Sequence, residues 1–244
     1  MIFMKIFVKT SFAAVIAIAA AVILMPQFTF AQDEDKPIDK SAVASTGTKA
    51  SDFAPKGWKV EEEVKGDVTA DGIPDLVIKL IEDKKTSEDE PVNRNRALVV
   101  AVSDGKGSYR TAAINDNLLQ CTSCGGAFYG VLDAPADVAI VKGVIVTSDE
   151  SGSRWVSNTE YKFRYDSTLD KFVLIGFDYA SRDRAEASVS SESTNYITSK
   201  RITETSKGKR TVKKTAVIKK TVITLDELNA EELEGEALKR LGLD

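Results

Sequence analysis

Residues 53–225 carry short apolar runs of the kind that form β-strands. The runs are LVIKLI, ALVVAVS, VAIVKGVIVTS and KFVLIGFDY, and many of their residues are β-branched. In EYKFRYD, Tyr161, Phe163 and Tyr165 alternate with charged residues, as in a strand that buries one face. The segment DSTLD then predicts a hairpin turn into KFVLIGF. The pattern therefore predicts an all-β domain, either an antiparallel meander or sandwich or a barrel-like fold.

The last residues, 226–244, change to a helical period. Leu233 and Ala237 fall on one helical face, and Asn229 followed by Glu232 is a possible capping box. Acidic residues come early and basic residues late, as the helix dipole prefers. We expect a short amphipathic helix packed on the sheet, and the alternative is a loosely attached tail.

The first 31 residues have the features of a secretory signal. Lys5 and Lys9 precede a long apolar run, and the small residues Thr29 and Ala31 lie at the two positions that a signal peptidase reads. We expect cleavage after Ala31, a secreted or periplasmic protein, and no stable transmembrane segment after cleavage. The alternative is an anchor that stays attached. Residues 32–52 are polar and are expected to form a flexible linker before the β domain.

Charge and composition exclude several classes of function. The chain has 33 basic and 37 acidic residues, so we expect no nucleic-acid partner. It contains no histidine, which excludes Ser-His-Asp and Cys-His catalysis and the zinc sites that need histidine. An enzyme would have to use other groups, and a carboxylate-dependent hydrolase acting on glycans stays an alternative. Its candidate acids are Glu160, Asp166, Asp170 and Asp178, and no spacing in the sequence marks two of them as a pair. The aromatic residues that would stack on a sugar are Trp155 and Tyr179.

The segment GDVTADGIPDLVIKL has the spacing of a calcium loop. Calcium prefers oxygen ligands from a loop that curls around it, and Gly72 allows the sharp turn. Ile78 stands where an EF-hand has a bidentate glutamate, so the loop is not an EF-hand. The alternative is a solvated turn without metal, because turns also select Asp and Gly. The candidate ligands are Asp67, Thr69, Asp71, Ile73 through its carbonyl, and Asp75.

At Asp67, Asp71, Gly72 and Asp75 the loop resembles the calcium loop of FG-GAP or VCBS-type repeats. Their pattern is Asp-x-Asn-x-Asp-Gly-x-x-Asp followed by a strand, and Thr69 replaces the usual Asn. The resemblance implies one structural calcium ion, held weakly. It covers about a dozen residues and no second copy occurs, so a propeller is not expected. The rest of the chain resembles uncharacterised secreted bacterial proteins.

Two cysteines lie close together in CTSCGG. An even pair in an exported chain indicates a disulfide between Cys121 and Cys124 that closes a turn. A redox-active pair, half of a zinc site and two free thiols are the alternatives.

A basic tract follows, SKRITETSKGKRTVKKTAVIKK, which predicts a hairpin that turns at Gly208. Its lysines are expected to protect a sheet edge from aggregation. The alternative is an anion-binding surface at Lys213, Lys214, Lys219 and Lys220 for an anionic envelope polymer.

Together these features predict a non-enzymatic secreted or periplasmic β-module with a structural calcium loop. It would bind a polymer or a protein partner, or act as a scaffold, in the cell envelope. The glycan-directed hydrolase is the alternative.

Overall fold

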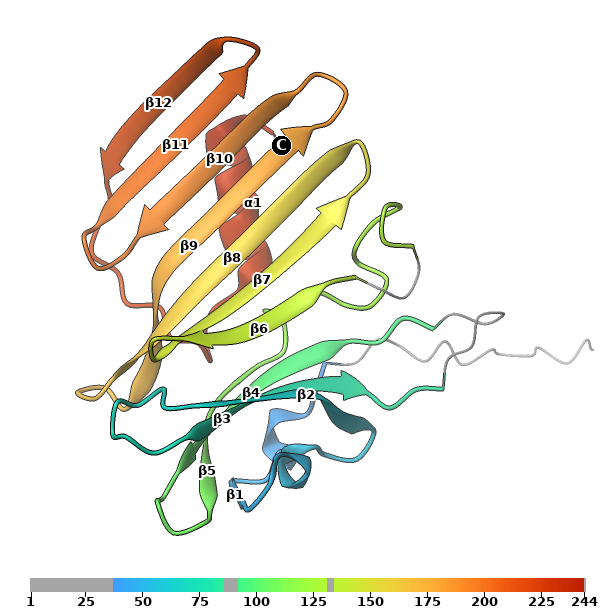
Figure 1. Cartoon of the computed structure of the whole chain (residues 1–244), viewed down its shortest axis with the longest axis vertical. Coiled ribbons are helices and arrows are strands. Elements are labelled where there is room, and N and C mark those ends of the chain that lie inside the picture. The colour runs from blue at the N-terminus through green and yellow to red at the C-terminus, as the bar shows by residue number, and fades with distance from the viewer. Residues whose placement is uncertain (1–36, 86–91, 131–133, 244) are drawn as a thin grey trace, which may run out of the picture. The chain divides into compact units, whose positions relative to one another are not determined.

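A computed structural model of the chain describes residues 37–85, 92–130 and 134–243, all within one compact unit that spans residues 35–244. Its strands form two antiparallel sheets, and a short helix follows them (Figure 1). The all-β class with a short C-terminal helix is therefore confirmed. In the described part of the chain, no helix has the length and apolarity needed to cross a membrane.

The five-stranded sheet has the order β1-β5-β4-β3-β2. Its strands are β1 (Thr46–Gly47), β2 (Trp58–Gly66), β3 (Asp75–Glu82), β4 (Arg96–Ser103) and β5 (Tyr109–Asn115). Every residue of β3 is buried, so both faces of this strand pack against other parts of the protein.

The seven-stranded sheet has the order β12-β11-β10-β9-β8-β7-β6, a meander in which each strand pairs with the next one in the chain. Its strands are β6 (Ala136–Val141), β7 (Val144–Gly152), β8 (Trp155–Asp166), β9 (Lys171–Asp183), β10 (Ser188–Asn195), β11 (Lys200–Lys207) and β12 (Arg210–Val217). The helix α1 (Ala230–Leu241) lies against one face of this sheet (Figure 1).

The main hydrophobic core includes residues from both sheets and from α1. Leu98 and Val100 of β4 share it with Phe163 and Phe177 of the seven-stranded sheet. Leu233 of α1 closes the same core. The alternation expected in EYKFRYD is present, because Phe163 is buried between exposed or half-buried neighbours.

A second core lies on the other face of the five-stranded sheet, where the structure differs from the expected linker. Residues 37–53 contain two 3₁₀ helices, Lys40–Ala42 and Ala50–Phe53, and the strand β1. Ile38 and Phe53 pack there against Ile78 of β3. A few apolar residues are enough to order this segment because β3 and β4 present a continuous apolar face that must be covered. Residues 1–36, with the expected signal, lie outside the described residues.

The helix α1 starts at the expected cap, Asn229. The Asn229 side chain accepts a hydrogen bond from the backbone N–H of Glu232 at 3.1 Å. At the other end Gly242 takes a left-handed conformation with φ of 68°. The helix is shorter than the expected 226–244, because the backbone is extended at Asn229 and left-handed at Gly242, which sets its two ends.

A buried ion-pair cluster holds α1 on the sheet. The Glu192 side chain is 0 % exposed, and Arg240 of α1 donates to both of its oxygens at 2.7 and 2.8 Å. Arg201 of β11 lies 3.1 Å from the same carboxylate. These contacts tie the helix to β10 and β11 through a bidentate pair, the stronger geometry for arginine and carboxylate.

Candidate functional site

The face of the seven-stranded sheet opposite α1 carries a groove of about 680 Å³ over β7–β10. Tyr161 and Glu192 contact α1, through Glu234 and Arg240. Because side chains alternate along a strand, their neighbours Glu160 and Ser191 point to the other face. This groove is the largest of the described cavities that could bind a ligand.

Strand pairing sets two rows of side chains across the groove. One row is Ser148, Glu160, Asp178 and Ser193, and each is the direct partner of the next. A second row is Glu150, Asn158, Ala180 and Ser191. The small side chains of Ala180, Ser191 and Ser193 on β9 and β10 thus form the floor of the groove. The acidic side chains of these two rows lie on β7, β8 and β9.

The positive charge of Lys162 offsets part of the negative charge of two groove carboxylates, Glu160 and Asp178. The Lys162 ammonium lies 2.5 Å from Glu160 and 2.6 Å from Asp178. Partial burial disfavours the ammonium, but the two carboxylates outweigh this and raise the pKa of Lys162. One lysine between two acids leaves a net negative charge at this point.

A second network surrounds Glu150. Its carboxylate accepts hydrogen bonds from the Tyr129 hydroxyl, from Asn158 at 2.6 Å and from Arg182 at 2.8 Å. The Tyr129 and Asn158 hydrogen bonds, with the nearby arginine charge, lower the pKa of Glu150. By contrast, Asp137 on β6 is exposed and makes no hydrogen bond or ion pair with any described residue.

The candidate catalytic residues separate in the structure. Glu160 and Asp178 come together, but Asp170 pairs with Arg110 at 2.8 Å and Asp166 caps the following turn. Of the aromatic candidates, Tyr179 is buried and points to the α1 side, while Trp155 is half exposed at the start of β8.

Sequence reasoning missed several groove residues. Lys162 and Glu150 gave no local signal, because the register of three strands brings them to their partners. Phe128, which does not line the groove, was also missed; it is 57 % exposed and Arg184 stacks on its ring at 4.3 Å.

The expected calcium loop is closed by its own backbone. The Asp67 carboxylate accepts hydrogen bonds from the N–H groups of Ala70 at 2.7 Å, Asp71 at 3.2 Å and Gly72 at 2.9 Å. The Gly72 amide contributes most to lowering the pKa of Asp67. Gly72 has a φ of 86°, so the turn uses the freedom that the sequence analysis assigned to it.

Asp75 joins this loop to the end of β4. Its side chain is fully buried and accepts from Val68 N–H at 3.0 Å, from the Thr69 hydroxyl at 3.3 Å and from Ser103 N–H at 2.8 Å. Asp75 thus fixes the first residue of β3 against its neighbours.

The donor chemistry of this loop fits a hard cation, whereas the present side-chain directions do not converge. Asp67, Asp71 and Asp75 form no ion pair within residues 37–85, 92–130 and 134–243. In the same ranges no group of three or more Asp, Glu, Cys or His side chains could hold a metal ion. Ile73 donates its N–H to Asp71 at 2.8 Å. Calcium binding stays a prediction.

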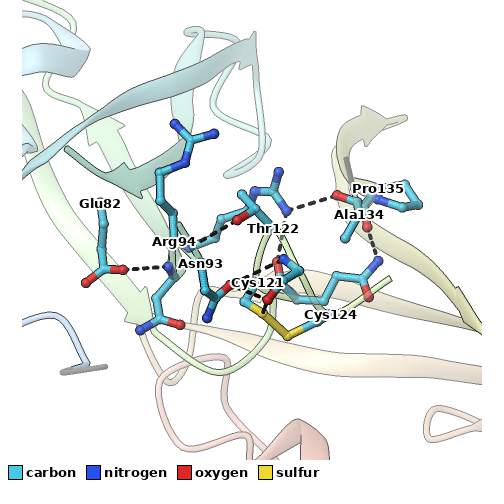
Figure 2. Close-up of a disulfide and its surroundings, with 12 residues drawn as sticks. Glu82, Asn93, Arg94, Cys121, Thr122, Cys124, Ala134 and Pro135 are labelled. Atoms are coloured by element: carbon cyan, nitrogen blue, oxygen red, sulfur yellow. Dashed lines mark hydrogen bonds between the residues drawn. A yellow bond between two sulfur atoms is a disulfide. The ribbon is translucent and has the colours of Figure 1, made fainter. Parts of the chain in front are cut away.

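Cys121 and Cys124 form a disulfide with a Cα–Cα distance of 5.1 Å, as predicted. Figure 2 shows how its loop attaches to the residues before β4. Thr122 exchanges hydrogen bonds of 3.0 Å with Arg94, and its carbonyl accepts from Ala134 N–H at 3.2 Å. These contacts are those of a structural bridge that holds a turn.

The basic tract forms the expected hairpin, β11–β12. Every residue of β12 is exposed, and the strand is the free edge of its sheet. Lys213 lies 3.7 Å from Glu204. Within the described residues, the hairpin and the segment after it carry cations without an ion pair, namely Lys200, Lys209, Arg210, Lys214, Lys219 and Lys220.

A cluster of acidic and hydroxyl groups lies between α1 and the sheet. Tyr161 donates to Glu234 of α1 at 2.7 Å, and burial is the main cause that raises the pKa of Glu234. Burial, with the nearby Glu234 charge, raises the pKa of Asp149 from its ordinary 3.8 to about 7. A hydrogen bond with Thr159 offsets part of this. Asp149 is therefore mostly protonated at mildly acidic pH.

Comparisons with known proteins identify no family for this chain. No family model, no curated protein and no solved structure matches the chain. The groove and the hairpin of the seven-stranded sheet are therefore the two surfaces that bear on function.

Proposed function

We propose that the protein is a non-enzymatic, secreted or periplasmic β-module that binds an anionic polymer of the cell envelope. The observation that carries the proposal is the β11–β12 hairpin, whose edge strand is exposed along its whole length. Lys213 and Lys214 point to opposite faces of this strand, and Lys219 and Lys220 follow it directly.

Physical chemistry supports a polymer rather than a small anion. The cations lie along an extended hairpin instead of converging on one point, so each contact is weak and exposed. A polyanion touches many of them at once, and several weak contacts on one chain add to a useful affinity. Such binding is expected to weaken as salt screens the charges.

A matched pair of polymers tests this proposal. Wild-type protein is expected to bind dextran sulfate but not uncharged dextran at about 50 mM salt, and to lose this binding at about 0.5 M salt. Replacing Lys213, Lys214, Lys219 and Lys220 by serine is expected to weaken binding by tenfold or more, measured by calorimetry.

The control removes the same number of charges elsewhere. The exposed lysines Lys56, Lys85, Lys106 and Lys239 form no ion pair within the described residues, and their serine variant is expected to bind like wild type. If the hairpin variant binds dextran sulfate as tightly as this control, the hairpin is not the binding surface.

The alternative function, a carboxylate-dependent hydrolase acting on glycans, has one observation in its favour. Glu160 and Asp178 are direct partners across the groove. However, Lys162 contacts both, so a cation rather than a shared proton compensates them. Release of reducing ends from soluble glycans by wild type, and not by Asp178→Asn, would favour the hydrolase over the binding module.

The proposal includes a weak structural calcium ion in the loop that precedes β3. Three carboxylates close in sequence, which form no ion pair with any residue that the structure describes, support it. If the dissociation constant is about 0.5 mM, calcium at about 5 mM adds about 1.4 kcal/mol. This corresponds to a rise in Tm of about 3–6 °C over an EDTA sample. Asp71→Ala is expected to abolish the rise; equal melting with and without calcium in wild type would identify a metal-free turn.

A further inference from the structure

The seven-stranded sheet carries opposite charges at its two ends. The groove over β7–β10 is lined on its β6 side by Asp137, which forms no ion pair with any described residue, and it contains the two acids that share Lys162. The edge at β12 carries cations that form no ion pair with the described residues, including Arg210 and Lys214. The acidic groove and the basic hairpin are therefore complementary in charge.

The two surfaces cannot meet within one molecule. β11 pairs with β10 over eight residues, from Ser188↔Lys207 to Asn195↔Lys200. The hairpin is thus part of the same continuous sheet whose open face forms the groove. Folding the hairpin over the groove would break this pairing, so the groove has to take its basic partner from another chain.

The hairpin has further features of a contact surface. Val217 is 84 % exposed and Val212 is 40 % exposed, although both are aliphatic. The outer edge of β12 also presents backbone N–H and C=O groups that no strand pairs with. Apolar side chains between lysines suit a groove that is acidic and in part apolar.

Pairing of two β12 edges with each other is disfavoured. In a centred antiparallel pair of Arg210–Val217 with its copy, Lys213 would lie opposite Lys214. Like charges placed directly opposite destabilise strand pairs, and edge lysines commonly block such contacts. A contact between the hairpin and a different, acidic surface avoids this repulsion.

We propose that the β11–β12 hairpin of one copy docks in the groove of a second copy. Such a head-to-tail contact leaves one free hairpin and one free groove, so it continues into a ring or an open chain. Because the contacts are exposed ion pairs and a small apolar area, the association is weak and sensitive to salt. It does not depend on polymer binding, and its test contains no polymer.

Sedimentation equilibrium of the purified protein tests this contact. At about 20 mM salt the weight-average mass is expected to rise above that of the monomer between about 0.05 and 1 mM protein, and to return to the monomer at about 0.5 M salt. A protein that stays monomeric at about 1 mM in low salt overturns the proposal.

Charge-reversal variants test whether the hairpin and the groove are the two surfaces that make this contact. Lys213→Glu/Lys214→Glu makes the hairpin acidic, and Asp137→Lys/Glu160→Lys makes the groove basic. Each variant alone is expected to be monomeric, and an equimolar mixture is expected to associate again, since each hairpin then finds a groove of opposite charge. Failure of the mixture to associate overturns the assignment.

Two further variants keep the test decisive. Lys56→Glu/Lys106→Glu reverses two exposed charges away from both surfaces and is expected to associate like wild type. Asp137→Lys alone covers the case in which the double groove variant does not fold, because Asp137 is exposed and makes no described contact. Association of this single variant equal to wild type would contradict the role of the groove.

Discussion

Replacing Glu192 by alanine is expected to lower the free energy of unfolding by about 3–5 kcal/mol. The Glu192 side chain is 0 % exposed, and its loss leaves Arg240 and Arg201 partly buried without their carboxylate. For a protein of this size the loss corresponds to a fall in Tm of about 6–20 °C. Chemical denaturation followed by circular dichroism measures the free energy directly.

Glu236→Ala is the matched control for this variant. Glu236 also pairs with Arg240, at 2.9 Å, but it is exposed on the outer side of α1. An exposed pair contributes about 0–1 kcal/mol, so this control is expected to melt close to wild type. Equal stabilities for the two variants would contradict the assignment of Glu192 as the contact that holds α1 on the sheet.

Raising the pH from about 4 to 8 is expected to destabilise the protein through Asp149. Its pKa is about 7 in the folded state and 3.8 in its ordinary state, so the unfolded chain ionises first as the pH rises. The stabilisation is complete below pH 3.8 and is lost as the pH rises through about 7. The free energy of unfolding falls by about 2–4 kcal/mol over this pH range. The lower figure allows for screening by solvent, because Asp149 is partly exposed.

Asp149→Asn removes this titration. The variant is expected to unfold with a flatter pH profile than wild type and to be more stable at pH 8, as measured by urea denaturation at several pH values. Glu234 on α1 also has a raised pKa and faces the same cluster as Tyr161 and Tyr179, so part of the slope remains. An unaltered profile in Asp149→Asn would contradict a protonated Asp149.

The sequence predicted those features that depend on neighbouring residues. The alternation in EYKFRYD identified the buried side of β8, because a period of two residues is a local property. The cap at Asn229 and the disulfide between Cys121 and Cys124 also lie within a few residues of chain.

Features that depend on distant residues were not predicted. The order of residues 37–52 follows from the apolar outer face of β3 and β4, which needs a cover. The run LVIKLI, which is apolar apart from Lys79, was a signal for burial on both faces, since a half-exposed strand alternates. The groove required Glu160 and Asp178 to share a register that spans a turn and a bulge after Lys162, and no local pattern reveals that register.

The calcium loop lies between these two cases. The positions of Asp67 and Gly72 predicted the tight turn correctly. The spacing did not predict that Asp75 would point into the protein toward Ser103 N–H. The direction of each carboxylate depends on the strands beside the loop, and these come from distant parts of the chain.

Mapping a polyanion onto the protein by NMR tests the proposed function most directly. At a protein concentration low enough to keep the molecule monomeric, addition of short dextran sulfate chains is expected to shift the amide signals of Arg210–Val217 and of Lys219 and Lys220, and to leave those of the groove residues Asp137 and Asp178 in place. Shifts confined to the groove, or no shifts at about 20 mM salt, would contradict a binding module that works through the β11–β12 hairpin.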